Sequence, residues 1–405
     1  GGVLSALSVP LVTALGPSMT NDPASIVVLA ALSFLAPTTV LSAISPMVAK
    51  ARLADLGETG KVIGSLSAAG TFGALAGTFV TGFVLVAALP SRPTVLVVAA
   101  ALVLAGVAFW VATLRASRAP RRAAAGTTVI SLGLVALSGL SPAYCDVESA
   151  YSCIRIVPDP DRASGLSLYL ADLRNSYVDL GDPTYLDFRY FRLAADVAAA
   201  LPEGPIDAFH VGGAGFTFPR YLEATRPGSD QLVFEIDEAL VDVARDRLGL
   251  VTGPTLRVRI GDARTGLDEL ADDAFDLVVG DVFAGFSAPW HLTTAEVLAE
   301  FDRALRPSGI FMANVIDGGQ HRFLRAELAT MQTAFDHVAV IVPPGGATTQ
   351  LSNYVVVGSD APLPAFDVDP ADGLFLSETL TDEFIADARV LTDDFAPADQ
   401  LLQSS

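Results

Sequence analysis

The sequence predicts two kinds of fold in one chain: an N-terminal bundle of transmembrane α-helices, and a C-terminal Rossmann-like α/β domain preceded by a small β-domain. Three observations favour this division. Long apolar stretches without charged residues fill the chain up to residue 143, and 51% of the 405 residues are hydrophobic. From residue 207 onward, apolar strands end one after another in glycine or an acidic residue. Between these regions, short segments alternate apolar and polar residues.

The transmembrane bundle is predicted from five apolar stretches that contain no Asp, Glu, Lys or Arg: 1–16, 25–48, 62–89, 94–114 and 127–143. Most reach the roughly 20 residues that a helix needs to cross a bilayer. Because no ionisable residue lies within a stretch, we expect an anchor or scaffold and no ion pathway. Gly73 and Gly77 form a G-x-x-x-G motif, which allows close helix packing. The chain does not start with methionine, so further N-terminal spans are expected.

Basic residues indicate the orientation of the bundle. The loops after the second and fourth stretches are basic, whereas the loop between the third and fourth has only Arg92; the basic residues are Lys50, Arg52, Lys61, Arg115, Arg118, Arg121 and Arg122. Since basic loops face the cytoplasm, the fifth crossing places the C-terminal domain outside the cytoplasm in a multi-pass plasma-membrane protein. The fifth stretch is short and contains Gly133, Gly139 and Pro142, so an alternative without this crossing stays open.

The charge and the cysteine content of the sequence limit which partners and ligands the C-terminal part of the chain can have. After residue 143 the chain has 17 Lys or Arg and 42 Asp or Glu, a net charge of −25, which excludes nucleic acid as a partner of this surface. The only two cysteines, Cys145 and Cys153, are a disulfide candidate in an oxidising compartment, with two unpaired buried thiols as the alternative. The four histidines have no ligand spacing, so no metal site is predicted.

The segment from Asp207 to Asp281 predicts a nucleoside site. It begins with a strand, a glycine turn at 212–215 and a helix from Thr217, and glycines there let main-chain N–H groups approach a ligand. The next three strands end in acidic residues. Such a βαβ unit binds mononucleotides and uses an acid to accept hydrogen bonds from ribose hydroxyls. The candidate residues are Gly212, Gly213, Gly215, Glu235, Asp237, Asp262, Ala263 and Asp281.

The expected domain boundaries follow these patterns. Residues 1–143 are transmembrane helices, and 144–186 are the small β-domain, where SCIRIVPD and SGLSLYLAD alternate apolar and polar residues. Residues 187–360 form the Rossmann-like domain, which opens with an amphipathic helix that ends before Pro202. Residues 361–405 are expected to be a tail that packs on this domain.

Motifs between Asp146 and Leu402 resemble one family, the polyamine aminopropyltransferases (spermidine synthases), in their bacterial form fused to a multi-pass membrane domain. The motifs are DVESAYSCIRI, SYVDLGDPTYLDFRYFR, HVGGAGFTFPRYL, VFEID, GDAR, VVGDVFAG, APWHLTT, LRPSGIFMANVI and VLTDDFAPADQLL. The resemblance implies a methyltransferase-type Rossmann domain and transfer of an aminopropyl group from decarboxylated S-adenosylmethionine to an amine. It also implies that the small β-domain helps two subunits to form a homodimer.

The resemblance also assigns roles to residues. It makes Asp281 the general base and Glu235 the ribose acceptor, and it puts Asp262 and Ala263 beside the adenine. The glycine turn becomes the cofactor loop.

On the acceptor side, the resemblance places Tyr190 in the substrate segment. Phe283 and Trp290 fall in a loop that closes over the substrate in this family. The alternative for that loop is a helix entry capped by Thr293 or Thr294.

Three departures from the family pattern concern the amine. Ala214 stands where the family has an aspartate in the glycine loop, and Ala284 where a second aspartate follows the base. Phe191 and Arg192 replace a His-Glu pair after the tyrosine of the substrate segment. The changes remove acceptors for a cationic amine, and the arginine is expected to repel one. An ordinary polyamine is therefore a doubtful acceptor.

Three functions remain open. The first is a membrane-anchored, spermidine synthase-like transferase that uses decarboxylated S-adenosylmethionine on an amine. The second is a methyltransferase with S-adenosylmethionine as donor, and the third is a non-catalytic extracytoplasmic binding module. The two donors are cytoplasmic metabolites, which conflicts with an extracytoplasmic domain unless the membrane part supplies them. No metal is expected, and the partners are a small-molecule substrate and the lipid bilayer.

Overall fold

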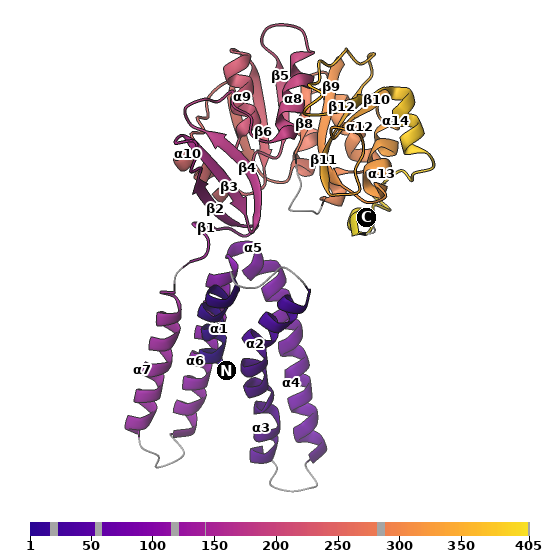
Figure 1. Cartoon of the computed structure of the whole chain (residues 1–405). Helices are drawn as coiled ribbons and strands as arrows, with labels where there is room; N and C mark the ends of the chain where they lie inside the picture. Colours follow the sequence, from indigo (N-terminus) through magenta and orange to yellow (C-terminus); the bar gives the residue numbers. More distant parts are fainter. Residues whose placement is uncertain (17–22, 53–58, 115–120, 142, 282–287, 404–405) are drawn as a thin grey trace. The chain divides into compact units, whose positions relative to one another are not determined.

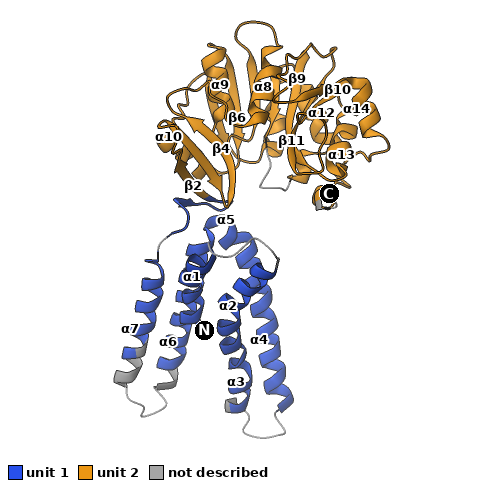
Figure 2. Cartoon of the chain, viewed as in Figure 1, with its two compact units in different colours: residues 1–153 blue, residues 154–405 orange. Residues whose placement is uncertain are grey.

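The computed structural model describes residues 1–16, 23–52, 59–114, 121–141, 143–281 and 288–403. The chain divides into two compact units, unit 1 (Gly1–Cys153) and unit 2 (Ile154–Ser405), which Figure 2 shows in different colours. Unit 1 contains the apolar helices, and unit 2 contains the large sheet and most of the small one.

Unit 1 is built from helices (Figure 1), and most of them have predominantly apolar sequences. Helix α1 packs against α2, α6 and α7. Small residues make these contacts close: Ala6 and Ala99 are fully buried, and a Cβ at Gly2 would lie 2.6 Å from the carbonyl oxygen of Ala99. The bounds are α1 Gly2–Leu15, α2 Pro23–Ser42, α3 Ile44–Arg52, α4 Thr59–Val80, a π-helical turn Thr81–Leu85, α5 Val86–Ala88, α6 Ser91–Leu114 and α7 Arg121–Ser138.

The lengths of the apolar helices support three of the five predicted spans. Among the described residues, three helical stretches are long and apolar enough to cross a membrane: Ala24–Lys50, Thr59–Leu85 and Ser91–Val111. The other two predicted spans form shorter apolar helices, Gly2–Leu15 and Thr128–Ser138.

The G-x-x-x-G motif lies on α4, which buries no residue. A Cβ built at Gly73 or at Gly77 would meet no atom within 4 Å. Within the part of the chain that the structure describes, the motif therefore does not serve the helix packing that its sequence allows.

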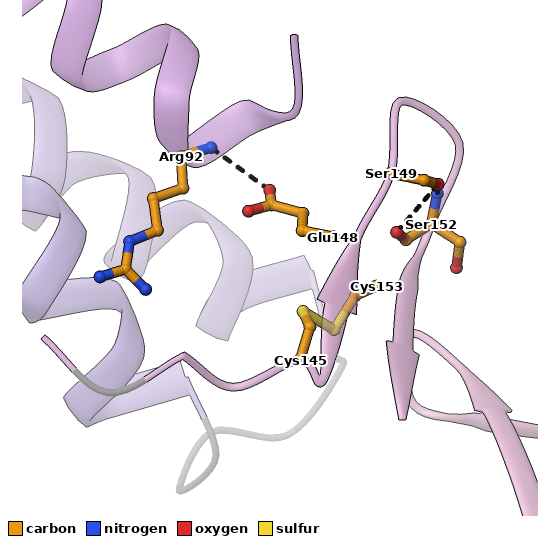
Figure 3. The surroundings of a disulfide bond; sticks show 6 residues. All are labelled: Arg92, Cys145, Glu148, Ser149, Ser152 and Cys153. Carbon is orange, nitrogen blue, oxygen red and sulfur yellow. Dashed lines mark hydrogen bonds between the residues drawn. A yellow bond between two sulfur atoms is a disulfide. The ribbon is translucent and has the colours of Figure 1, made fainter. Parts of the chain in front are cut away.

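A disulfide joins Cys145 and Cys153 and closes a loop that contains the short strand β1 (Val147–Glu148). The first turn of α6 contacts this region: the Arg92 N–H donates to Oε1 of Glu148 at 3.3 Å, as Figure 3 shows. The Arg92 guanidinium donates to the carbonyl oxygens of Gly139 (2.7 Å) and Ser141 (2.6 Å). The end of α7 and the disulfide loop therefore lie at the same end of unit 1 as the start of α6.

The described part of unit 2 has an eight-stranded sheet with the order β12-β10-β11-β9-β8-β5-β6-β7. Neighbouring strands from β7 to β9 are parallel, and β11 is antiparallel to both β9 and β10. The chain order reverses at β5, where ligands of such sheets bind. The bounds are β5 Asp207–Val211, β6 Asp230–Glu235, β7 Leu256–Ile260, β8 Phe275–Gly280, β9 Leu305–Asp317, β10 His337–Val342, β11 Ser352–Ser359 and β12 Leu374–Leu376.

Helices cover both faces of this sheet, because alternate strand residues point to opposite sides. On β5, Ala208 packs in a core with residues of α8 and α9, whereas Phe209 packs in a second core with residues of α12 and α13. The bounds are α8 Arg189–Ala199, α9 Thr217–Thr225, α10 Glu238–Arg247, α11 Ala263–Gly266, α12 Ala295–Ala304, α13 Arg322–Met331, α14 Glu378–Ile385 and α15 Ala398–Gln403.

A small antiparallel sheet precedes the large one in unit 2. Strand β3 (Gly165–Leu170) pairs with β2 (Cys153–Pro158) on one side and with β4 (Leu173–Asp179) on the other. It occupies the region where the sequence predicts hairpins. Thr217, the first residue of α9, donates to the carbonyl oxygen of Tyr177 at 2.8 Å, so β4 is fixed beside the start of that helix.

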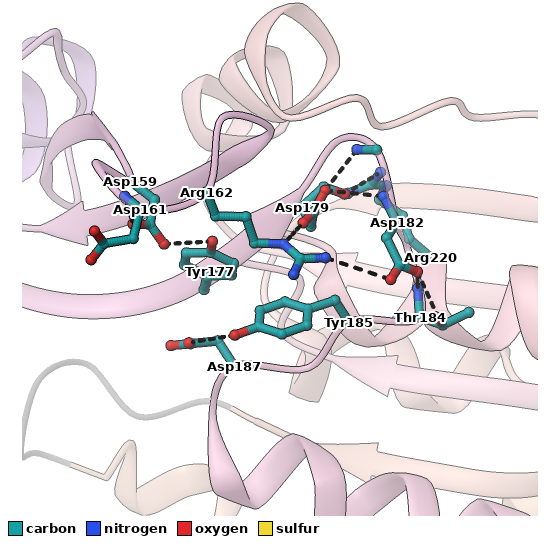
Figure 4. A network of polar contacts seen from close by, with 11 residues as sticks. Asp159, Asp161, Arg162, Tyr177, Asp179, Asp182, Thr184, Tyr185, Asp187 and Arg220 are labelled. Carbon is teal, nitrogen blue, oxygen red and sulfur yellow. Dashed lines mark hydrogen bonds and ion pairs between the residues drawn. The ribbon is translucent and has the colours of Figure 1, made fainter.

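The end of β4 carries a buried carboxylate, Asp179, in a polar network (Figure 4). The Arg162 guanidinium donates to it and lies 3.9 Å from the ring centre of Tyr185. The N–H groups of Gly181 and Asp182 donate to its Oδ1 at 2.7 and 3.0 Å. Burial alone would raise the pKa of Asp179, but these donors outweigh burial and lower the pKa to about 2.

This network predicts a pH-dependent contribution to stability. The lowered pKa stabilises the fold above the ordinary aspartate pKa, and the effect is lost as the pH falls towards 2. Asp179→Asn should therefore lower the free energy of unfolding by about 2 kcal/mol at pH 7 and by less near pH 3. Urea unfolding of the purified chain at both values measures this, with the exposed Asp161→Asn as control. An equal loss at both pH values would contradict the linkage.

Candidate active site

The glycine turn after β5 has the left-handed backbone that its sequence favours. Gly212 has φ +92°, and its N–H donates to the carbonyl oxygen of Phe234 on β6. Ala214 and Phe216 also have positive φ values of 44° and 54°, which cost roughly 1–2 kcal/mol for residues with a Cβ. A Cβ at Gly215 would lie 2.6 Å from the Ser176 hydroxyl, so only glycine lets β4 come this close.

Glu235, the last residue of β6, holds this turn in place. Its Oε2 accepts from the N–H groups of Gly213 (2.9 Å) and Ala214 (3.1 Å), and its Oε1 accepts from the N–H of Asp237 (3.0 Å). The side chain is buried. The residue predicted as a ribose acceptor therefore also orders the loop predicted to hold the cofactor.

Two further predicted acids of the rim, Asp237 and Asp262, begin helices. Asp237 accepts from the N–H of Ala239 at 3.1 Å at the start of α10. Asp262 accepts from the N–H of Arg264 at 2.9 Å at the start of α11, and its second oxygen lies 3.2 Å from Nε2 of His291. Both carboxylates thus have the helix-capping role that commonly competes with a ligand role.

Asp281 follows β8 and receives two hydrogen bonds from distant elements. The Tyr190 hydroxyl on α8 donates to Oδ2 at 3.0 Å, and the Asn314 amide on β9 donates to Oδ1 at 3.1 Å. Asn314 is oriented in turn by the Asn353 amide on β11, which donates to its Oδ1 at 2.9 Å. Burial raises the pKa of Asp281, and the two donors oppose that rise. Burial also keeps the pKa of Tyr190 well above its ordinary value.

The structure thus brings together Tyr190 and Asp281, and Glu235 with the glycine turn. It also adds Asn314 and Asn353, which the sequence analysis missed. Their signal was an asparagine within an otherwise apolar strand, in FMANVI and SNYVVV.

Two other predicted residues, Ala263 and Trp290, have different surroundings, and Phe283 lies outside the described part of the chain. Ala263 is buried in the core that contains Phe209, and Trp290 is half exposed in a short 3₁₀ turn, Trp290–Leu292. Phe283 and Ala284 lie outside the described residues. In the described chain, no group of three or more His, Cys, Asp or Glu side chains is arranged to hold a metal ion.

Arg192 differs from its expected role. Its guanidinium forms a two-pronged ion pair with Asp372, at 2.8 and 2.6 Å, and donates to the carbonyl oxygens of Leu186 and Asp187. The sequence analysis expected this charge to repel an amine. Because the charge is paired with Asp372, it is not free to do so. Phe191, the neighbouring departure, packs in the core against Phe218.

Among the comparisons with known proteins, the one with solved structures found similar folds. No family model and no curated protein matches the sequence. The structure is similar to a probable spermidine synthase from Corynebacterium glutamicum ATCC 13032, with 27% sequence identity, a TM-score of 0.58, and coverage of 63% of this chain and 98% of that one. The C-terminal α/β part has a spermidine synthase-like fold.

Weaker structural similarities were also found. Human methyltransferase-like protein 13 in complex with SAH has 17% identity and a TM-score of 0.39, covering 53% of this chain and 99% of that one. Spermidine synthase from Thermotoga maritima has 16% identity and a TM-score of 0.40, covering 60% and 87%.

The hydrogen bonds to Asp281 predict how its pKa responds to substitution. Tyr190→Phe and Asn314→Ala each remove a donor that stabilises the ionised carboxylate, so each should raise the pKa of Asp281 further. Carbon-13 NMR titration of labelled aspartates measures this, with Asp281→Asn assigning the resonance. Tyr185→Phe is the control, since its hydroxyl contacts Asp187 instead. A pKa that stays constant or falls in the first two variants would show that these bonds do not act on Asp281.

Proposed function

We propose that the chain is a membrane-anchored, spermidine synthase-like transferase that moves a group from an adenosyl donor to an amine. The observation that carries this proposal is the environment of Asp281. The carboxylate follows the strand next to the switch point of the sheet, burial raises its pKa, and two side chains hold it in position. The similarity to a probable spermidine synthase supports the same reaction class.

The rim residues fit an adenosyl group. Gly212, Gly213 and Gly215 leave the turn without side chains, so a ligand can approach its backbone. Glu235 orders this turn and lies at the end of the next strand, where a ribose acceptor belongs. We assign donor binding to Gly212, Gly213, Gly215, Glu235, Asp237, Asp262 and Ala263. A decarboxylated S-adenosylmethionine type of donor would supply an electrophilic carbon bound to a sulfonium.

Asp281 would serve as the general base. As the amine nitrogen forms its bond to that carbon, the carbon–sulfur bond breaks and its electron pair remains on sulfur. The proton lost by the amine passes to Asp281, which accepts it more readily because burial raises the carboxyl pKa. Tyr190 and Asn314 orient the two carboxylate oxygens. We place Tyr190, Trp290 and Phe283 on the acceptor side.

Binding and transfer test this proposal separately. The full chain, purified in detergent, should bind methylthioadenosine or decarboxylated S-adenosylmethionine with micromolar affinity, about −8 kcal/mol. Asp281→Asn should keep this affinity and lose transfer of label from the donor to amines by a factor of about 100 or more. Calorimetry measures the first result, and product analysis measures the second.

Controls make the result specific. Glu235→Ala should weaken nucleoside binding at least tenfold, because it removes a ribose acceptor and the acceptor that orders the glycine turn. Glu223→Ala, an exposed site on α9, should change neither result. Full transfer activity in Asp281→Asn would refute the base assignment, and no nucleoside binding by the unaltered chain would refute the enzyme itself.

We infer further that the chain beyond α7 lies outside the cytoplasm. Two features of unit 1 support this. Helix α7 packs beside α6, and the hydrogen bonds of Arg92 keep Gly139 and Ser141 at the end of the bundle where α6 starts. The basic segment after the other end of α6 should face the cytoplasm. The disulfide suits the opposite, oxidising side.

Reporter fusions test this orientation. Alkaline phosphatase fused after Ser405 should be active, since it folds only outside the reducing cytoplasm. The same enzyme fused after Arg118, in the basic segment, should be inactive. Activity in the second fusion and not in the first would invert the orientation and would remove the conflict with a cytoplasmic donor.

A further inference from the structure

A row of hydrogen-bonded polar side chains crosses the end of the large sheet, from Asp281 after β8 through Asn314 on β9 to Asn353 on β11. The Asn314 amide donates to Oδ1 of Asp281 at 3.1 Å. The Asn353 amide donates to Oδ1 of Asn314 at 2.9 Å. The proposed reaction uses the first bond to hold the base. The part that the second bond plays depends on which other groups can hold the Asn314 amide.

The surroundings of Asn314 are otherwise apolar. The side chain is buried, and alternate residues of a strand face the same side of a sheet. Its neighbours on this side are therefore Met312 on β9 and Val355, its partner on β11. Both are buried in the core that also contains residues of α8. In the described chain, the Asn314 amide is hydrogen-bonded to Asp281 on one side and to Asn353 on the other.

The chemistry of these groups gives the row a direction. An ionised carboxylate only accepts hydrogen bonds, whereas an amide donates through nitrogen and accepts through oxygen. The Asn314 nitrogen therefore faces Asp281, and the Asn314 oxygen faces β11, where it needs a donor. Asn353 supplies that donor. An acceptor at position 353 would attract the Asn314 nitrogen and would leave the amide oxygen against the carboxylate.

Arg189 on α8 holds the main chain at Asn353. Its guanidinium donates to the Asn353 carbonyl oxygen at 3.2 Å and to the Ser352 hydroxyl at 2.8 Å. The next residue of α8, Tyr190, donates to the other oxygen of Asp281 at 3.0 Å. The first turn of α8 therefore supplies one donor to the carboxylate directly. It also fixes the start of β11, which carries the side chain that orients the second donor.

We propose that Asn353 is a positioning residue for the transfer reaction, because its amide determines which end of the Asn314 amide faces Asp281. The inference deepens the proposed function and rests on it only for the role of Asp281 as base. Asn353 acts on the base through Asn314. Substitution of Asn353 by an uncharged residue should therefore change the pKa of Asp281 only while Asn314 is present.

Other charged groups act on Asp281 less directly. Tyr190 donates to it, and the charge of Glu235 on β6 raises its pKa. Strand β11 contains no charged residue. The remaining charged side chains of the adjoining described elements have contacts elsewhere: Arg189 with β11, Arg192 and Asp196 on α8 with Asp372, Asp317 on β9 with the N–H groups of Gly318 and Leu324, His210 on β5 with Gln231, and Arg306 on β9 with Asp207 and Asp276.

A double-mutant cycle separates the effect of the amide from the effect of charge. Asn353→Asp replaces the donor by an acceptor and adds a negative charge. It should raise the pKa of Asp281 by both routes, because the Asn314 oxygen and the new charge each disfavour the ionised carboxylate. In the Asn314→Ala background only the charge remains, so the rise should be smaller. Carbon-13 NMR titration of labelled aspartates in the full chain measures this, with Asp281→Asn assigning the resonance.

Asn353→Leu tests the amide without a change of charge. It removes the donor to Asn314, so it should raise the pKa of Asp281 when Asn314 is present and leave it unchanged in Asn314→Ala. Asn353 is only partly buried, so both substitutions should allow folding. Gln400→Glu, at an exposed position on α15, adds the same charge as Asn353→Asp and should not change the pKa.

The pH dependence of transfer should follow the pKa. In Asn353→Asp, the pH at which kcat/KM reaches half its maximum should rise, and transfer below that pH should fall at least about fivefold. Transfer of label from decarboxylated S-adenosylmethionine to a panel of primary amines measures this. A loss of stability alone would lower the rate at every pH without moving the midpoint. Methylthioadenosine affinity should stay unchanged, because Asn353 contacts Asn314 and not the glycine turn.

The outcomes distinguish this proposal from the proposed function. An equal rise in the pKa of Asp281 for Asn353→Asp in both backgrounds would overturn the proposal, since charge alone would then act. An unchanged pKa in Asn353→Leu would also overturn it. The expected pKa changes without transfer by the unaltered chain would support the action of Asn353 on Asp281 and would refute the proposed reaction instead.

Discussion

The three backbone N–H groups that donate to Glu235 are the constraint on which the active-site end of the sheet depends. They join the end of β6 to the glycine turn after β5, and so they fix the turn in a backbone that includes Ala214 at positive φ. Without the Glu235 carboxylate, these N–H groups would lose the acceptor that satisfies them. The cost of the left-handed residues is offset because the same carboxylate accepts from the turn after β5 and from the turn after β6.

The surroundings of Asp281 show how the fold brings residues that are distant in the sequence together at one site. Its two donors come from α8 and β9, which are separated from it by 91 and 33 residues. Burial favours the protonated acid, whereas the donors favour the carboxylate, and burial has the larger effect. The result is a base stronger than an ordinary aspartate that is still held in one orientation.

The sequence was sufficient for the parallel sheet and its acidic rim, because strand-end acids and a glycine turn are local patterns. It was insufficient where a partner comes from far along the chain. Arg192 was expected to repel a cation, yet its partner Asp372 lies 180 residues away. Asn314 and Glu327 looked like ordinary polar positions in an apolar strand and in a helix. Three of the five predicted spans coincide with helical stretches that are long and apolar enough to cross a membrane, and the first and fifth spans stay predictions.

The two carboxyl groups near the sheet edge, Asp281 and Glu327, have contrasting environments. Asp281 has two hydrogen-bond donors; Glu327 has only burial acting on its pKa. Enzymes commonly give two acids different tasks in this way: one lies in a polar, hydrogen-bonded environment and the other in an apolar one. Here the better-solvated group is suited to take a proton during transfer.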